Sequence, residues 1–445
     1  MNIGAVHNST RWLARALVLG LVAGFAIPQA LQQAGLSQVG LAQAQEERRQ
    51  VPPMSERAYQ MLSNIQEALD EDDFQEALRL GDRALGTRGL NDNERAQINN
   101  MMAFTHFNME NYRRAMQHYE RVLEAGENIS RGLETQTVYA LAQLYYLEEE
   151  YQRSLDYMRR WMDSEESPGP DAYVFMGQLH FQLEDFPSAI ERIERGIEVA
   201  RSRGTDIREN WWQLLRFLYW EQENYPRVVE ILEILVRDFP SREYWLQLAA
   251  LYGQEGDEER QARTMEAAHA GGFFERESDY LSYAGLLMQR QVPYRAAKWL
   301  EEGFDRGIVE ENASNLRMLG QAWQMAHEVD RAIPVLQNAA RAAEDGEIFA
   351  RLAGLFLERE DNAECIEAAD RALDRGDLRD RPQTYMVKAI CQFNAESLAD
   401  ARSTFSQCSR EARSAGDERT ERSCRQWMTF IDSEVQRRER LEASL

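Results

Sequence analysis

Apolar positions along this chain recur with the period of a helix, in stretches of two helices' length separated by short polar turns. The clearest example is residues 132–163. The positions that define the pattern are Leu141, Ala142, Tyr145, Tyr151, Ser154, Met158 and Trp161. The order is large, small, aromatic, then aromatic, small, large, which predicts two antiparallel amphipathic helices joined by a tight turn.

The same pattern returns with a period of about 34 residues. A small residue in each first helix is usually followed twelve positions later by one in the second helix, as in Ala103 and Ala115, or Gly177 and Ala189. Two helices approach to about 8–10 Å only where both carry a small side chain at the crossing. We therefore predict an all-α fold, a right-handed α-solenoid of about ten helix pairs over residues 55–411.

The two ends of the chain depart from this repeat. Residues 412–445 predict a C-terminal capping helix, with Trp427, Phe430 and Ile431 on one side covering the last repeat. At the other end, Arg11 and Arg15 precede an apolar run over residues 17–27, and Ala42-Gln43-Ala44 has the small-x-small form of a cleavage site. Residues 1–44 therefore predict a signal peptide that directs export, with an uncleaved membrane anchor as the alternative. The lead at residues 45–54 is polar, contains Pro52 and Pro53 near its end and is expected to be flexible.

Net charge and composition limit the classes of molecule that this chain is expected to bind. The net charge of −24 argues against nucleic acid, and a hydrophobic content of 44% argues against wholesale disorder. After the leader, no segment has 18 consecutive apolar residues, so we expect no membrane span in the exported body. The acidic surface favours solubility or a basic partner.

All four cysteines lie near the C-terminal end. Repeat geometry should place Cys365 opposite Cys391, and Cys408 opposite Cys424, and an exported protein meets an oxidising compartment. We predict disulfides in these two consecutive pairs, with four free core thiols as the alternative. Zinc is disfavoured because no C-x-x-C pair is present.

No catalytic motif is found. The chain has no glycine-rich phosphate loop, no G-x-S-x-G and no H-E-x-x-H. His106 and His180 occupy the same repeat position and are interpreted as core or groove residues, while His118, His269 and His327 stand singly on different predicted helices. We predict a protein that is not an enzyme and has no cofactor and no metal site.

The repeat resembles a known family. Small-x-x-aromatic, an acidic turn and then aromatic-x-x-Ala is similar to the tetratricopeptide repeat, and this resemblance covers nearly all of residues 55–410. In such superhelices the first helix of each pair lines the concave face, and the positions one and four after the small residue point into it. With the residues one turn earlier, these positions form a stripe: Phe104, Phe107, Tyr139, Gln143, Tyr146, Gln178, Phe181, Gln213, Phe217 and Trp220.

This stripe of rings and amides suits an extended or helical peptide, because rings supply contact area and amides hydrogen-bond to a backbone. The alternative is that the rings pack against neighbouring repeats. Binding of acidic chaperone tails is disfavoured because it uses lysine and arginine on this face, and Lys298 and Lys388 are the only lysines in the chain.

Several stretches also resemble a more particular family, the periplasmic tetratricopeptide accessory proteins of TonB-type energy transduction systems in Gram-negative bacteria. The resemblance depends most on residues that repeat packing does not require, at 134–137 (ETQT), 242–245 (REYW) and 324–326 (QMA). It implies a periplasmic helper of ExbB, ExbD and TonB proteins, which power outer-membrane uptake of iron carriers and haem. A generic exported scaffold in envelope or cell-wall assembly is the alternative.

Overall fold

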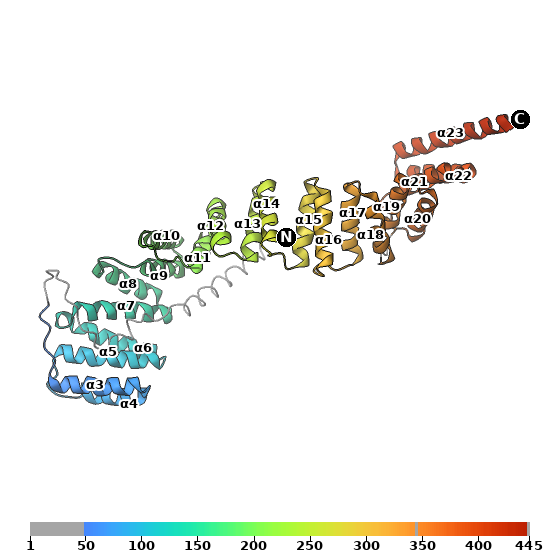
Figure 1. Cartoon of the computed structure of the whole chain (residues 1–445). Coiled ribbons are helices and arrows are strands. Elements are labelled where there is room, and N and C mark those ends of the chain that lie inside the picture. Colours follow the sequence, from blue (N-terminus) through green and yellow to red (C-terminus); the bar gives the residue numbers. More distant parts are fainter. Residues whose placement is uncertain (1–48, 343–345, 443–445) are drawn as a thin grey trace. The chain divides into compact units, whose positions relative to one another are not determined.

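The computed structural model describes residues 49–342 and 346–442, and over these residues the fold is all-helical (Figure 1). It contains 21 α-helices in a paired, tetratricopeptide-like arrangement, with no strand in the described residues, as the sequence predicts. The expected signal peptide lies outside the described residues. The chain divides into two compact units, one ending at Phe239 and the other beginning at Pro240.

Over its described residues, 49–239, unit 1 contains five helix pairs. Its helices are α3 (Glu56–Asp70), α4 (Phe74–Leu85), α5 (Asp92–Asn108), α6 (Tyr112–Glu124), α7 (Arg131–Leu147), α8 (Tyr151–Ser164), α9 (Pro170–Gln182), α10 (Phe186–Arg203), α11 (Glu209–Glu221) and α12 (Tyr225–Asp238). The N-caps follow the sequence signals, since the side chain of Ser55 caps α3 and that of Asp73 caps α4.

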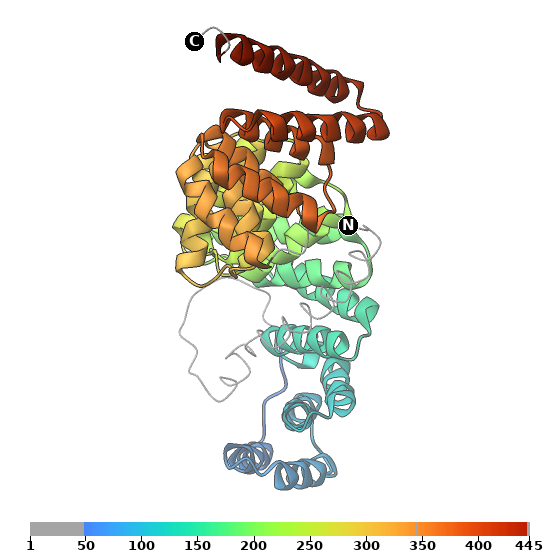
Figure 2. The ribbon, with the colours of Figure 1, turned by 90° about the vertical axis from the view of Figure 1, so that its right-hand side faces the viewer.

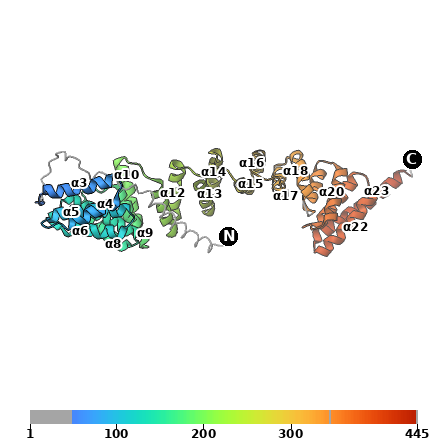
Figure 3. The same ribbon diagram turned by 90° about the horizontal axis from the view of Figure 1, so that it is seen from below.

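In its described residues, unit 2 contains five further pairs and a single last helix. Figure 3 shows this last helix at the C-terminal end of the ribbon. Its helices are α13 (Arg242–Gln254), α14 (Glu258–Ala270), α15 (Glu277–Gln289), α16 (Pro293–Asp305), α17 (Ala313–Met325), α18 (Val329–Ala342), α19 (Glu347–Glu358), α20 (Asn362–Arg375), α21 (Arg381–Asn394), α22 (Leu398–Ala415) and α23 (Glu418–Glu442). A hydrophobic core runs from Ala249 to Cys391 and contains the fully buried Trp323.

In two pairs of unit 1, the contacts show that the helices approach where the small residues meet. In α7 and α8 the hydroxyl of Ser154 donates a hydrogen bond to the carbonyl of Ala142, 2.5 Å away, and both residues are fully buried. In α9 a Cβ at Gly177 would lie 2.5 Å from Cγ1 of Ile193. The twelve-residue spacing in the sequence therefore marks the helix crossing.

The turns between the two helices of each pair share one backbone geometry. After the α7 helix ends, Glu149 adopts a left-handed conformation with φ 62°, and the next N–H, that of Glu150, donates to the carbonyl of Tyr145 at 2.8 Å. This is a Schellman motif, which satisfies a carbonyl at the helix end. The left-handed residues of the ten such turns are Asp72, Glu110, Glu149, Glu184, Glu223, Gly256, Gln291, His327, Glu360 and Glu396.

The last helix covers the end of unit 2. Helices α22 and α23 lie side by side (Figure 2), and on α23 Ile431 is fully buried while the ring of Trp427 stacks on Phe405 with centroids 5.3 Å apart. Phe430 keeps half of its surface exposed. Of the three apolar residues that the sequence places on one side of this helix, Ile431 is buried, Trp427 is half-buried and Phe430 is exposed.

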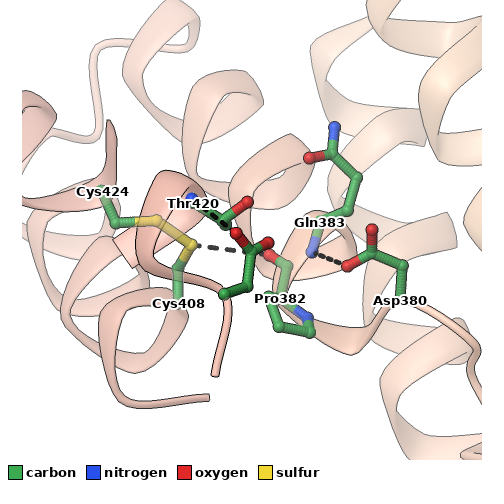
Figure 4. Close-up of a disulfide and its surroundings, with 7 residues drawn as sticks. Asp380, Pro382, Gln383, Cys408, Thr420 and Cys424 are labelled. Atoms are coloured by element: carbon green, nitrogen blue, oxygen red, sulfur yellow. Dashed lines mark hydrogen bonds between the residues drawn. A yellow bond between two sulfur atoms is a disulfide. The ribbon is translucent and has the colours of Figure 1, made fainter. Parts of the chain in front are cut away.

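Both disulfides join neighbouring helices of unit 2. Cys365 on α20 is bonded to Cys391 on α21, and Cys408 on α22 is bonded to Cys424 on α23, which is the consecutive pairing that the sequence predicts. Figure 4 shows the second bond, with Sγ of Cys408 3.5 Å from the carbonyl oxygen of Pro382. Disulfides persist in oxidising compartments, so these bonds indicate a location outside the cytosol.

Candidate peptide-binding surface

The ten residues of the predicted stripe all lie on first helices of unit 1. Each helix contributes residues three or four positions apart, which share a face of a helix. They are Phe104 and Phe107 on α5, Tyr139, Gln143 and Tyr146 on α7, Gln178 and Phe181 on α9, and Gln213, Phe217 and Trp220 on α11.

Exposure differs along the stripe. Tyr146 and Gln178 are buried, with 8% and 2% of their surface exposed, so these two residues offer almost nothing to a ligand. Trp220 is exposed at 36%, and the other seven stripe residues are half-buried. The accessible surface is therefore reduced to eight of the ten predicted residues.

The rings also pack against one another, which is the alternative that the sequence left open. Phe181 lies 5.8 Å from Phe217 of the next pair and 6.0 Å from Phe186 of its own pair, measured between ring centroids. Trp220 has one such neighbour, Tyr225, at 5.5 Å. Phe181 thus belongs partly to the packing between repeats, and Trp220 is the ring with the most surface left for a partner.

Burial governs the chemistry of the two stripe tyrosines. It raises the pKa of both Tyr139 and Tyr146 to about 12, so both phenols are neutral at physiological pH. Gln213 donates a 2.9 Å hydrogen bond from Nε2 to Oε1 of Glu209 one turn earlier. The exposed part of the stripe is therefore aromatic and amide in character, with a carboxylate beside it.

Unit 1 also has a hollow of about 670 Å³, which the sequence analysis did not predict. It is lined mainly by the second helices α10 and α12, which contribute Ile197, Ile231, Ile234 and several charged residues. The first helices α9 and α11 add Tyr173, Trp212 and Leu215. These charges neutralise one another, because Arg227 pairs with Glu194 at 2.7 Å and Arg195 pairs with Glu198 at 2.5 Å. Periodicity could have found the isoleucines but not the opening between the two helices.

The three described histidines of unit 1 contact neighbouring side chains. Nδ1 of His180 lies 3.0 Å from Oδ2 of Asp185, at the start of the next helix, and the ring of His106 stacks on that of His118 at 5.4 Å. Among the described residues no cluster of three or more His, Cys, Asp or Glu side chains is arranged to hold a metal. Within the same residues, no helix has the length and apolar character needed to cross a membrane.

Comparison with known proteins identifies one repeat directly. Residues 96–127, covering most of α5 and all of α6, match the family model described as tetratricopeptide repeat. None of the curated proteins compared matches the chain.

Solved structures with the same kind of helix pairs are distant in sequence. A tetratricopeptide repeat protein from Parabacteroides merdae is 14% identical, with 68% of this chain and 100% of that chain covered and a TM-score of 0.36. MamA from Desulfovibrio magneticus is 16% identical, covering 42% of this chain and 96% of that one with a TM-score of 0.34. YrrB, described as a tetratricopeptide protein with an unusual peptide-binding site, is 12% identical, covering 42% and 90% with a TM-score of 0.32.

The matched repeat lies within a longer series of similar helix pairs. The chain therefore contains a tetratricopeptide repeat at residues 96–127, and its other described helix pairs have a tetratricopeptide-like arrangement.

Proposed function

We propose that the protein is a non-catalytic scaffold that holds an extended or helical peptide of another protein against the stripe of unit 1. The observation that carries this proposal is the row of half-buried rings and amides on four successive first helices, which ends in the exposed Trp220. Tryptophan and tyrosine combine large contact area with a polar group, and they dominate the energetics of many protein interfaces.

We further propose that the scaffold works in the periplasm with TonB, ExbB and ExbD proteins during energised uptake of iron carriers or haem. The resemblance at residues 134–137, 242–245 and 324–326 supports this role, and the two disulfides and the expected signal peptide support export. A net charge of −24 favours a basic partner segment.

A generic scaffold of envelope or cell-wall assembly is the second candidate, because the same fold and the same export signals serve it equally. The neighbouring genes distinguish the two. Genes for ExbB, ExbD and TonB beside this one favour uptake, whereas genes for cell-wall synthases or polysaccharide export favour envelope assembly.

The direct test is titration of the purified protein with the periplasmic segment of the TonB-type protein from the same organism. Trp220→Ala removes the most exposed ring of the stripe and should weaken binding by at least about tenfold, the loss expected when a tryptophan is a hot spot of an interface. Tyr59→Ala is the matched control, because Tyr59 is 53% exposed on α3, outside the stripe, and its loss should leave binding unchanged. Equal affinity of the Trp220→Ala variant and the wild type would remove the stripe from the account.

A further inference from the structure

The described part of the lead contacts the first helices of unit 1. Residues 49–54, which are its described part, contain no helix or strand, and they contact side chains at the beginning of α5 and α7. We call these side chains the lead-binding surface and define it as Asn91, Asn93, Glu94 and Glu134. A flexible lead was expected from the sequence, so these contacts were not foreseen.

The hydrogen bonds match what a proline pair can offer. Proline has no N–H, so Pro52 and Pro53 present only carbonyl oxygens. Nδ2 of Asn93 donates to the carbonyl of Pro52 at 3.0 Å, and Nδ2 of Asn91 donates to that of Pro53 at 2.8 Å. Two amide donors thus serve two consecutive acceptors.

The lead-binding surface is prearranged for this task. The N–H of Glu94 donates to Oδ1 of Asn91 at 2.9 Å, so the amide of Asn91 is fixed with its NH₂ group toward the lead. Glu94 is 2% exposed and accepts the N–H of Ser55 at 2.7 Å. Burial alone would raise the pKa of Glu94, but the hydrogen bonds from Ser55 and Asn91 hold it below its usual value.

An ion pair favours a basic residue three positions before Pro52. Nη1 of Arg49 lies 2.6 Å from Oε2 of Glu134, and about a quarter of each side chain is exposed. Glu134 also pairs with Arg160 of α8. Arg49 is therefore held by a carboxylate that is already positioned by a second arginine.

From these contacts we infer that the lead-binding surface is a docking site for an extended Arg-x-x-Pro-Pro segment of a partner protein, and that the chain's own Arg49–Pro53 segment occupies it until a partner segment competes. This site is separate from the aromatic stripe, because none of the ten stripe residues belongs to it. A negative result for the lead-binding surface would therefore leave the proposed function of the stripe unaffected.

Competition between the two segments can be measured with a labelled peptide of residues 45–55, added to the purified protein and followed by fluorescence anisotropy. A tethered segment acts at an effective concentration in the millimolar range, so a peptide that binds with a dissociation constant on the order of 100 μM should appear about tenfold weaker while the lead stays in place. Arg49→Glu in the protein expels the lead by like-charge repulsion with Glu134. The labelled peptide should bind this variant about tenfold more tightly than the wild type.

Further variants separate specific docking from general charge effects. In the Arg49→Glu background, adding Glu134→Gln should abolish the tighter binding of the labelled peptide. Adding Glu148→Gln should leave it unchanged, because Glu148 pairs with Arg113 away from the lead. Circular dichroism verifies that each variant is folded. Equal binding to the wild type and to Arg49→Glu, or no binding to either, would overturn the inference. A wild-type dimer that Glu134→Gln abolishes would also overturn it, by showing that the competing segment is the lead of a second copy.

Limited trypsin digestion of the wild type gives an independent readout. Cleavage after Arg49 should be slow while its side chain is paired, and Glu134→Gln should accelerate it at least about fivefold, with Glu148→Gln unchanged. Equal cleavage rates in all three proteins would contradict the docking of the lead in solution.

Discussion

At the scale of single residues, a buried pair of histidines makes unit 1 sensitive to acid. His118 is 9% exposed, its Nδ1 lies 2.8 Å from Oδ1 of Asn99, and its ring stacks on His106. The amide of Asn99 already donates from Nδ2 to the carbonyl of Arg95, so Nδ1 of His118 is the donor in this hydrogen bond. Burial, with smaller contributions from His106 and Arg121, lowers the pKa of His118 to about 4.

This shift gives an expected pH dependence. A folded-state pKa below the unfolded value of about 6.5 means that the unfolded chain takes up the proton first, so the stabilisation is present above pH 6.5 and is lost as the pH falls toward 4. We expect a loss of about 2 kcal/mol between pH 7 and pH 5. Hydrogen exchange of α5 and α6 at the two pH values measures it. His118→Phe keeps the ring and should flatten this dependence, and an unchanged loss in that variant would contradict the assignment.

The sequence predicted which helices carry the stripe residues, but it did not predict how exposed each residue is. The repeat rule gives the direction in which a side chain leaves an average first helix, and it placed all ten residues on the expected helices. It does not give exposure, because that depends on the neighbouring pair. Tyr146 is buried beside Phe175, a residue of the following helix pair whose ring lies 5.5 Å away.

At the scale of helices and turns, the spacing of small residues predicted more of the fold than any single motif did. It identified the helix pairs and their crossings because close approach of two helices leaves no room for a larger side chain. The left-handed turns were not foreseen, since glutamate at Glu110, Glu149 and Glu184 gives no signal for positive φ. Glycine would have revealed them, and of the ten turns it occurs only at Gly256.

A glycine at a crossing provides the test of this packing argument. In Gly177→Ala the new Cβ would lie 2.5 Å from Cγ1 of Ile193 and 3.1 Å from the backbone oxygen of Ala189, so the helices must separate. We expect a loss of about 1–3 kcal/mol in the free energy of unfolding, measured by urea denaturation.

The matched control is another helical glycine. Gly354 on α19 would place its Cβ with no described atom within 4 Å, so Gly354→Ala should gain about 0.5–1 kcal/mol from helix propensity alone. Similar effects of the two substitutions would refute the crossing as the reason for glycine at position 177.

At the scale of the whole molecule, the repeat period predicted the architecture but not its division at Pro240 or the docked lead. A periodic pattern describes contacts between neighbouring helices, whereas the lead reaches 85 residues along the chain, from Arg49 to Glu134. Each unit presents its own surface. The stripe and the lead-binding surface both belong to unit 1, and the disulfides belong to unit 2.

The central claim is that the stripe of unit 1 holds another polypeptide, and photo-cross-linking in cells tests it most directly. A photoreactive phenylalanine analogue placed at Trp220 should form an adduct with a TonB, ExbB or ExbD protein, identified by mass spectrometry, while the same analogue at Tyr59 should not. Equal labelling at the two positions, or no adduct at position 220, would contradict the account. An adduct with a cell-wall synthase would keep the scaffold and assign it to envelope assembly.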